Sequence, residues 1–281
     1  MRARSLIAIA ALAAGACAAA ASFAAPVIRQ FADVRPSAVS VDVELVIAVD
    51  ISYSMDPEEQ ELQREGYAQA LRSAEFLKAL RQGIHGKIAI TYFEWAGPST
   101  QQIIIPWRVV DGPETADALA AEISRTPLKR ASRTSISGAL LFAKPLFDAS
   151  GFRGLRRVID VSGDGTNNSG ALIVPTRDDV LAAGITINGL PIMLKRPNAS
   201  TLDIDELDVY YEDCVIGGPG AFVIPIRERA QFVEATRTKL VLEIAGLQPE
   251  PRVIPVQSRK PRISCTIGER MWQERWGDGY R

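Results

Sequence analysis

The residues best suited to chemistry lie in Asp50-Ile51-Ser52-Tyr53-Ser54, which directly follows an apolar run ending at Val49. One carboxylate and two hydroxyls fall within a single turn. Hard oxygen ligands without cysteine or histidine suit Mg²⁺, which keeps several waters and leaves a position for an outside ligand. The alternative is that Asp50 and the two serines only make hydrogen bonds within the turn. The motif by itself is compatible with both interpretations.

Two more polar motifs stand at the ends of predicted elements. Ser162-Gly163-Asp164-Gly165 ends the predicted strand 157–162 and supplies a second carboxylate on a glycine-flanked turn. Arg133-Thr134-Ser135-Ile136-Ser137 opens a predicted helix, where hydroxyls are both caps and candidate ligands. In an open α/β sheet, ligands bind outside the carboxyl ends of the strands, where the strand order reverses. We therefore expect the three motifs at such a position.

The elements that carry these motifs alternate between strand and helix from residue 41 to residue 246. The continuous apolar run 43–49 is typical of a strand buried on both faces, and Asp56-Pro57-Glu58-Glu59 predicts the start of the next helix. The predicted strands are 43–49, 87–95, 102–110, 157–162, 184–191 and 221–226. The predicted helices are 57–82, 114–125, 135–150, 177–183, 204–213 and 227–245. This order predicts an α/β fold, with a doubly wound, mostly parallel central sheet flanked by helices.

One strand is expected to run against the others. Gly97-Pro98-Ser99 indicates a short hairpin turn, so the strand 102–110 that follows it should be antiparallel. This strand contains Pro106, which cannot donate a backbone hydrogen bond and therefore fits an edge position.

Composition and charge exclude several classes of function. The net charge of −1 gives no global field that would attract nucleic acid or an anionic membrane, and no base-reading motif is present. The single histidine, His85, is expected in an exposed turn, far from the motifs that a Ser–His or Cys–His nucleophile would need. There is no P-loop or G-x-G-x-x-G dinucleotide loop.

The N-terminus resembles a secretory signal peptide over residues 1–25, followed by a linker over residues 26–40. Arg2 and Arg4 precede an apolar stretch that is too short for a membrane span, and small residues then offer cleavage sites. Cys17 is a weak candidate for lipid attachment because the usual leucine three residues before it is missing. We therefore expect an exported protein, periplasmic or secreted, without a transmembrane span.

Cysteine usage and the C-terminal tail lead to two further expectations. Once Cys17 is removed with the signal, Cys214 and Cys265 would form a disulfide in an oxidising compartment, with two buried thiols as the alternative. Residues 247–281 are rich in proline and arginine and lack helical periodicity. This composition predicts an irregular extension that packs against the domain, with its basic residues exposed to solvent.

Together the three motifs resemble the metal-ion-dependent adhesion site (MIDAS) of the von Willebrand factor type A family, over about residues 41–245. The resemblance implies a domain over 41–246 that holds Mg²⁺, Mn²⁺ or Ca²⁺ and binds an acidic group of a protein partner through the ion, without catalysis. The implied metal ligands are Asp50, Ser52, Ser54, Thr134 and Asp164. Tyr53 stands where glycine is common, and Ser135 leaves open which hydroxyl of the loop is the ligand.

More narrowly, the chain resembles a bacterial family of exported proteins of unknown function with this fold. The segments that carry this resemblance are Gln63-Arg64-Glu65-Gly66, Phe93-Glu94-Trp95-Ala96-Gly97-Pro98, Val158-Ile159-Asp160-Val161-Ser162-Gly163-Asp164-Gly165 and Cys214-Val215-Ile216-Gly217-Gly218-Pro219-Gly220-Ala221-Phe222.

Two other functions stay open for this chain. A phosphatase of the haloacid dehalogenase type would use Asp50, Thr134, Lys144 and Asp164, but Ser52 stands where that chemistry needs an aspartate to protonate the leaving group. A metal-free scaffold is the third possibility.

Asp160, on an apolar strand, needs an arginine or hydroxyl partner because an unpaired buried carboxylate is costly. We expect its role to be structural.

Overall fold

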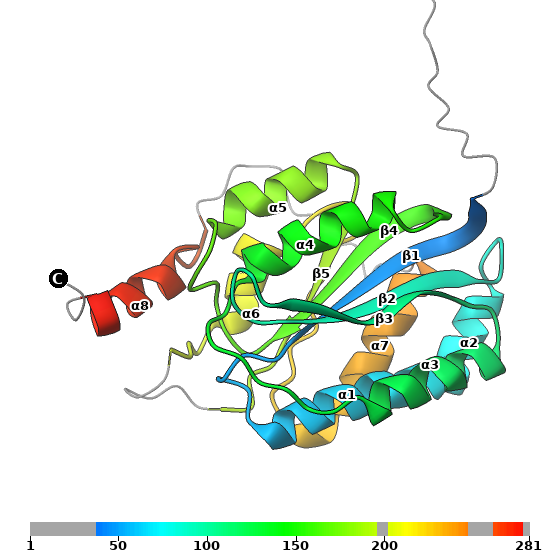
Figure 1. Ribbon diagram of the computed structural model, residues 1–281, viewed down its shortest axis with the longest axis horizontal. Helices are drawn as coiled ribbons and strands as arrows, with labels where there is room; N and C mark the ends of the chain where they lie inside the picture. Colours follow the sequence, from blue (N-terminus) through cyan, green and yellow to red (C-terminus); the bar gives the residue numbers. More distant parts are fainter. Residues whose placement is uncertain (1–37, 196–201, 247–260, 278–281) are drawn as a thin grey trace, which may run out of the picture. The chain divides into compact units, whose positions relative to one another are not determined.

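The computed structural model describes residues 38–195, 202–246 and 261–277, and its core is a five-stranded sheet in the order β3-β2-β1-β4-β5 (Figure 1). The central strand is β1 (Val39–Asp50), which pairs in parallel with β2 (Ile88–Trp95) and β4 (Phe152–Gly163). β5 (Thr186–Pro191) pairs in parallel with β4. The predicted mostly parallel sheet, with the Asp50 strand in its middle, is confirmed.

The antiparallel edge strand is also confirmed, since β3 (Gln101–Val110) pairs antiparallel with β2 across the predicted hairpin. The sixth predicted strand, 221–226, is wrong. Within the described residues this segment makes only isolated bridges to β5 and the residue beyond it, at Val223 and Ile226. Ile224 N and Ile226 N donate to Gly189 O and Pro191 O, but Pro191 has no N–H to donate in return, so the ladder is interrupted there.

Helices cover both faces of the sheet (Figure 1). One face packs against α1 (Pro57–Arg72), α2 (Ala74–Arg81), α3 (Pro113–Arg125) and α7 (Phe232–Ala245). The other face packs against α4 (Ile136–Asp148), α5 (Ile173–Ala182), the short α6 (Leu207–Tyr210) and the π-helical turn Tyr211–Val215. A 3₁₀ turn, Arg229–Gln231, precedes α7.

The single helix predicted over 57–82 is instead two helices. Ser73 has extended backbone angles, and its side chain accepts a hydrogen bond from Phe76 N, so it ends α1 and caps α2. A serine that can accept from the backbone offers the chain this alternative to a continuous helix.

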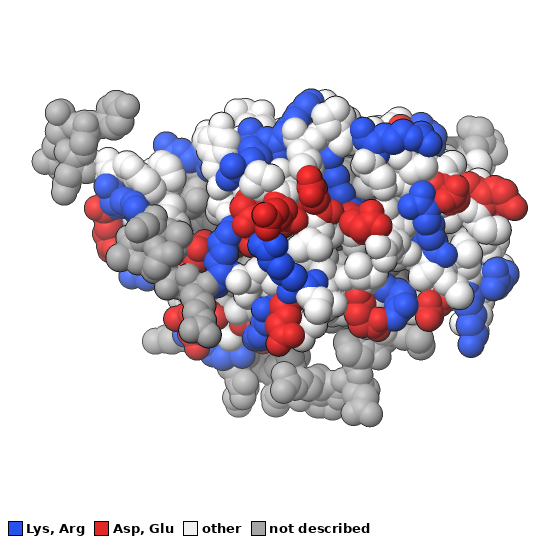
Figure 2. All heavy atoms as spheres, turned by 90° about the horizontal axis from the view of Figure 1, so that it is seen from below, with Lys and Arg blue, Asp and Glu red and all other residues white. Residues whose placement is uncertain are grey.

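Alternation along β1 explains the two apolar layers. Val43, Leu45 and Ile47 belong to the core beneath α1 and α7, whereas Val46 and Ala48 belong to the core beneath α4 and α5. Figure 2 shows the face on the α1 side, where acidic and basic side chains are interspersed. That face therefore presents no uniform charge to a partner.

Asp160 of β4 is buried in an ionic network within the first of these cores. Its carboxylate lies 2.5 Å from Lys239 Nζ and accepts a hydrogen bond of 3.1 Å from the Tyr67 hydroxyl. Lys239 also lies 2.5 Å from Glu243, which accepts from Asn188 Nδ2. The Tyr67 hydroxyl is one of the two kinds of partner expected for Asp160, and Lys239 is a further partner that was not predicted.

The C-terminal extension is only partly as expected. The disulfide between Cys214 and Cys265 is present. However, the described part of the extension holds a helix, α8 (Ile267–Trp276), where irregular chain was predicted. Only Gly268 of this helix is buried, so its sequence carries no apolar periodicity that would have identified it.

The predicted signal peptide, nearly all of the linker and residues 247–260 lie outside the described residues. None of the helices in the described part of the chain is both long and apolar enough to cross a membrane.

Candidate functional site

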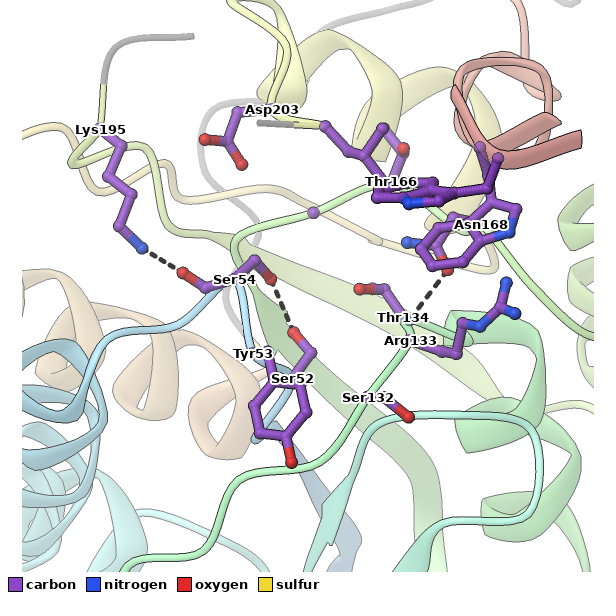
Figure 3. Close-up of a pocket in the computed structure, with 14 residues that line it drawn as sticks. Ser52, Tyr53, Ser54, Ser132, Arg133, Thr134, Thr166, Asn168, Lys195 and Asp203 are labelled. Atoms are coloured by element: carbon purple, nitrogen blue, oxygen red, sulfur yellow. Dashed lines mark hydrogen bonds between the residues drawn. The ribbon is translucent and has the colours of Figure 1, made fainter. Parts of the chain in front are cut away.

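The first motif is held at the carboxyl end of β1, at the middle of the sheet. Asp50 is fully buried, and its Oδ1 accepts a hydrogen bond of 2.7 Å from the backbone N of Ser52. The hydroxyls of Ser52 and Ser54 are 2.8 Å apart (Figure 3). The chain then enters α1 through a capping box between Asp56 and Glu59, as predicted.

The second carboxylate comes from the turn after β4, the strand next to β1. Ser54 Oγ donates a hydrogen bond of 2.6 Å to Asp164 Oδ1, so the two motifs are in direct contact. The close approach depends on Gly163, because a Cβ atom there would lie 2.7 Å from Asp50 Oδ2. Parallel pairing of β1 and β4 thus brings two motifs 110 residues apart in the chain into one cluster.

The loop before α4 brings Thr134 to the same place. Thr134 N donates to Asn168 Oδ1, and Asn168 N donates to Thr134 O, at 3.0 and 2.9 Å. Thr134 lines the cavity at the carboxyl end of the sheet (Figure 3). Ser135 is buried, and its Oγ accepts from Gly138 N as the N-cap of α4. Of the two neighbouring residues, therefore, Thr134 lines the cavity, whereas the hydroxyl of Ser135 caps the N-terminus of α4.

The two carboxylates carry an electrostatic penalty. Burial raises the pKa of Asp50 well above its usual value, and the neighbouring Asp164 raises it further. Burial likewise raises the pKa of Asp164 to about 7, against the hydrogen bond from Ser54 and the charge of Lys195. Both shifts mean that the charged forms are poorly stabilised by the protein alone.

This donor set fits a hard divalent cation. Asp50 Oδ2 is buried without a hydrogen-bond partner, and a bound cation would satisfy it while offsetting the charge of both carboxylates. The described residues include no group of three or more His, Cys, Asp or Glu side chains arranged to hold a metal. A cation here would therefore depend on two carboxylates supported by the hydroxyls of Ser52, Ser54 and Thr134.

Sequence reasoning missed Lys195, which follows β5 and reaches into the cluster (Figure 3). Its Nζ donates to Glu59 and to the carbonyl of Ser54, and lies 3.3 Å from Asp164 Oδ2. The one signal in the sequence was its position a few residues beyond the end of a parallel strand, where ligand-binding residues gather.

The cluster opens into a cavity of about 440 Å³. Its walls come from several loops and, unexpectedly, from α8. The lining residues are Ser52, Tyr53, Ser54, Ser132, Arg133, Thr134, Gly165, Thr166, Asn168, Lys195, Leu202, Asp203, Trp272 and Trp276. The C-terminal extension is therefore part of the site, a role that the sequence did not indicate.

Lys144, the phosphate-binding residue of the phosphatase alternative, lies elsewhere. It is on α4, pairs with Asp179 of α5 at 2.7 Å, and does not line the cavity. A phosphoryl group held at Asp50 would therefore not meet Lys144, the residue to which the phosphatase alternative assigns the phosphate contact.

Comparison with known proteins places the chain in context. The sequence model of the family described as "Protein of unknown function (DUF1194)" matches residues 40–248. No curated protein matches the chain. Among solved structures, proximal thread matrix protein 1 from the mussel byssus, with a zinc-occupied MIDAS motif, has a TM-score of 0.52 at 15% identity. The match covers 74% of this chain and 49% of that one.

Two further structures are similar. The von Willebrand factor type A protein from Catenulispora acidiphila has a TM-score of 0.51 at 15% identity, covering 73% of this chain and 43% of that one. The pilus adhesin SpaC from Lactobacillus rhamnosus GG has a TM-score of 0.55 at 11% identity, covering 73% and 31%. This chain spans about half or less of each of these proteins. The likeness confirms the von Willebrand factor type A fold that the motifs resemble.

Proposed function

We propose that this chain, which belongs to the DUF1194 family of proteins of unknown function and has the von Willebrand factor type A fold, binds a divalent cation and through it an acidic group of a protein partner. The proposed ligands are Asp50, Ser52, Ser54, Thr134 and Asp164. When bound, the ion supplies a coordination position for an oxygen of the partner's carboxylate.

The observation that carries this proposal is the pairing of Asp50 and Asp164. Both are buried, the pKa of each is raised, and Asp50 keeps an unpartnered oxygen. Burying two carboxylates side by side is costly unless a cation shares the site. The zinc-occupied MIDAS motif of the mussel protein adds support, because that protein has the same fold. Mg²⁺ is the ion we propose, with Mn²⁺ or Ca²⁺ as alternatives.

A binding role fits the site better than phosphoryl transfer. Ser52 stands two residues after the would-be nucleophile Asp50, and its hydroxyl is a poor acid near neutral pH. Lys144 points to a surface ion pair instead of the cavity. We therefore propose that the protein is not an enzyme.

We also propose that the protein is exported. A disulfide such as Cys214–Cys265 forms and persists in oxidising compartments, including the periplasm and the extracellular space. Residues 1–25 have the composition of a signal peptide.

Thermal unfolding with and without divalent ions tests the cation site. A ligand that binds only the folded state stabilises it, by about 2.7 kcal/mol at one hundred times its Kd. Millimolar Mg²⁺ or Mn²⁺ should raise the Tm of the wild type, and Asp50→Ala should abolish the response while leaving the protein folded. Asp117→Asn, which removes an exposed carboxylate of α3, is the matched control and should respond like the wild type.

Two outcomes would contradict the proposal. A wild type whose Tm is indifferent to divalent ions would favour the metal-free scaffold. Metal-dependent hydrolysis of a generic phosphate ester that needs Asp50 would favour the phosphatase.

A further inference from the structure

An exposed aromatic surface near the proposed cation site belongs to α8. The rings of Trp272 and Trp276 are stacked, with centroids 4.1 Å apart and planes inclined by 30°. Trp276 is 43% exposed, although tryptophan normally buries most of its large apolar surface. Both rings line the same cavity as Ser52 and Thr134. An apolar pair is thus presented next to the polar cluster.

The position of α8 is specified by the turn that carries Asp164. Asn167 Nδ2 donates a hydrogen bond of 2.8 Å to Glu269 Oε1, and the disulfide at Cys265 anchors the segment just before the helix. The backbone packs so closely that a Cβ atom at Gly268 would lie 2.2 Å from Asn167 O. The helix is therefore held beside the site by two contacts with Asn167 and by the disulfide just before it.

The loop before α4 also contacts the tryptophan pair, through Arg133. Arg133 has a φ of 74° and is the one non-glycine residue with positive φ among those the structure describes. Its guanidinium lies 3.6 Å from the ring centre of Trp272. A strained backbone of this kind persists where the surroundings hold it, commonly at ligand sites. Here it places a cation against the indole, directly beside Thr134.

The cavity therefore combines two kinds of recognition. Arg133 and Lys195 place positive charge in the cavity lining, whereas Trp276 and Tyr53 present exposed aromatic surface, with Trp272 stacked between Arg133 and Trp276. A ligand with a carboxylate alone would leave the aromatic wall unused. An aromatic side chain beside the carboxylate would cover this wall and release its water.

We propose that Trp272 and Trp276 form a subsite for an aromatic side chain, so that the partner is recognised through an acidic residue flanked by an aromatic residue. This inference rests on the proposed function, because the carboxylate is the group that the cation binds. The tryptophans determine specificity in this scheme and do not hold the ion.

Two tripeptides, acetylated and amidated so that aspartate is the only acid, test the subsite. Calorimetry with the oxidised protein in Mg²⁺ should give about five- to tenfold tighter binding of Phe-Asp-Phe than of Ala-Asp-Ala, the gain typical of one good aromatic contact. Phe-Asp-Phe should also change the tryptophan fluorescence. Phe-Asn-Phe, which lacks the carboxylate, should bind more weakly than either.

Substitutions of the two tryptophans test whether the preference for Phe-Asp-Phe over Ala-Asp-Ala depends on α8. Trp272→Ala and Trp276→Ala should bind the two tripeptides equally, at the affinity that the wild type has for Ala-Asp-Ala, and should keep the Mg²⁺-induced rise in Tm. Trp272→Phe should retain most of the preference, because it keeps an aromatic ring. Leu155→Ala, which removes an exposed apolar side chain at the start of β4, should change nothing.

Four outcomes would overturn the inference, and they separate it from the proposed function. Equal, Mg²⁺-dependent binding of both tripeptides would remove the aromatic subsite and leave the cation site standing. Binding of neither, with an intact Tm response to Mg²⁺, would do the same. Tighter binding of glucuronate than of Phe-Asp-Phe would assign the aromatic wall to an acidic sugar. Absence of both tripeptide binding and the Tm response would overturn the proposed function as well.

Discussion

Lys195 Nζ lies 3.3 Å from Asp164 Oδ2, so an ammonium group already stands beside one of the two carboxylates proposed to bind the cation. The same group donates to Glu59 and to the backbone of Ser54. Burial lowers the pKa of Lys195, but the carboxylates of Glu59 and Asp164 outweigh this effect and raise the pKa, so the charged form is favoured. We therefore expect the positive charge of Lys195 to weaken the binding of a metal cation at this site.

Removing the charge of Lys195 should strengthen metal binding. Like charges repel, and at a partly exposed site this repulsion amounts to a few kcal/mol at most. We expect Lys195→Met to lower the Kd for Mg²⁺ by about tenfold, measured by calorimetry. Lys144→Met, which removes a lysine from a surface ion pair on α4, should leave the Kd unchanged. Weaker Mg²⁺ binding by Lys195→Met would instead mean that the ammonium holds Asp164 in place for the ion.

The neighbouring hydroxyls Thr134 and Ser135 should have separable roles. Thr134→Ala should weaken Mg²⁺ binding with little change in Tm in the absence of metal, because its side chain faces the cavity. Ser135→Ala should lower the free energy of unfolding by about 1 kcal/mol, the usual cost of losing an N-cap, and keep the Mg²⁺ affinity. Chemical denaturation and calorimetry distinguish the two, and a reversed pattern would make Ser135 the ligand.

Loss of the disulfide should loosen the C-terminal extension without destroying the cation site. The bridge joins residues separated by 51 positions, which corresponds to about 4 kcal/mol in the chain-entropy account of disulfide stabilisation. Cys265→Ser should therefore unfold at lower denaturant concentration than the oxidised wild type. The Mg²⁺-induced rise in Tm should persist, since none of the proposed ligands is on α8. Its disappearance would show that α8 is needed to assemble the cation site.

The buried network around Glu243 should make stability depend on pH. Burial, and then the charge of Asp160, raises the pKa of Glu243 to about 7 in the folded protein. A raised pKa contributes stability that is complete below the unfolded value near 4.5 and is lost as the pH rises through about 7. One pKa unit corresponds to about 1.4 kcal/mol, so the loss is about 3 kcal/mol at most.

Glu243→Gln should flatten this dependence, because glutamine keeps the shape and does not ionise. The measurement is the free energy of unfolding between pH 4.5 and 7.5 in chelator, so that metal binding does not contribute. Glu234→Gln, at an exposed position of α7, should follow the wild-type curve. Parallel curves for Glu243→Gln and the wild type would show that Glu243 is not responsible.

Much of the fold follows from local sequence. The continuous apolar run before Asp50 predicts a strand covered on both faces, and the hairpin turn before Gln101 predicts the antiparallel edge. Asp56 and Pro57 identify the start of α1 because capping is a short-range interaction. Where local signals were weak the prediction failed, as at the exposed helix α8 and at the segment containing Pro225.

The candidate site, like the fold, could be predicted only in part from local sequence. Its carboxylates and hydroxyls could be identified from the sequence because each follows a strand or opens a helix, and the ligand set stays a prediction. Which side chains share the cavity was decided by tertiary structure alone. Lys195 reaches Asp164 through the placement of β5, and Trp272 reaches Arg133 through the docking of α8. Such contacts join segments with no local periodicity in common, so only the packing of the folded chain brings them together.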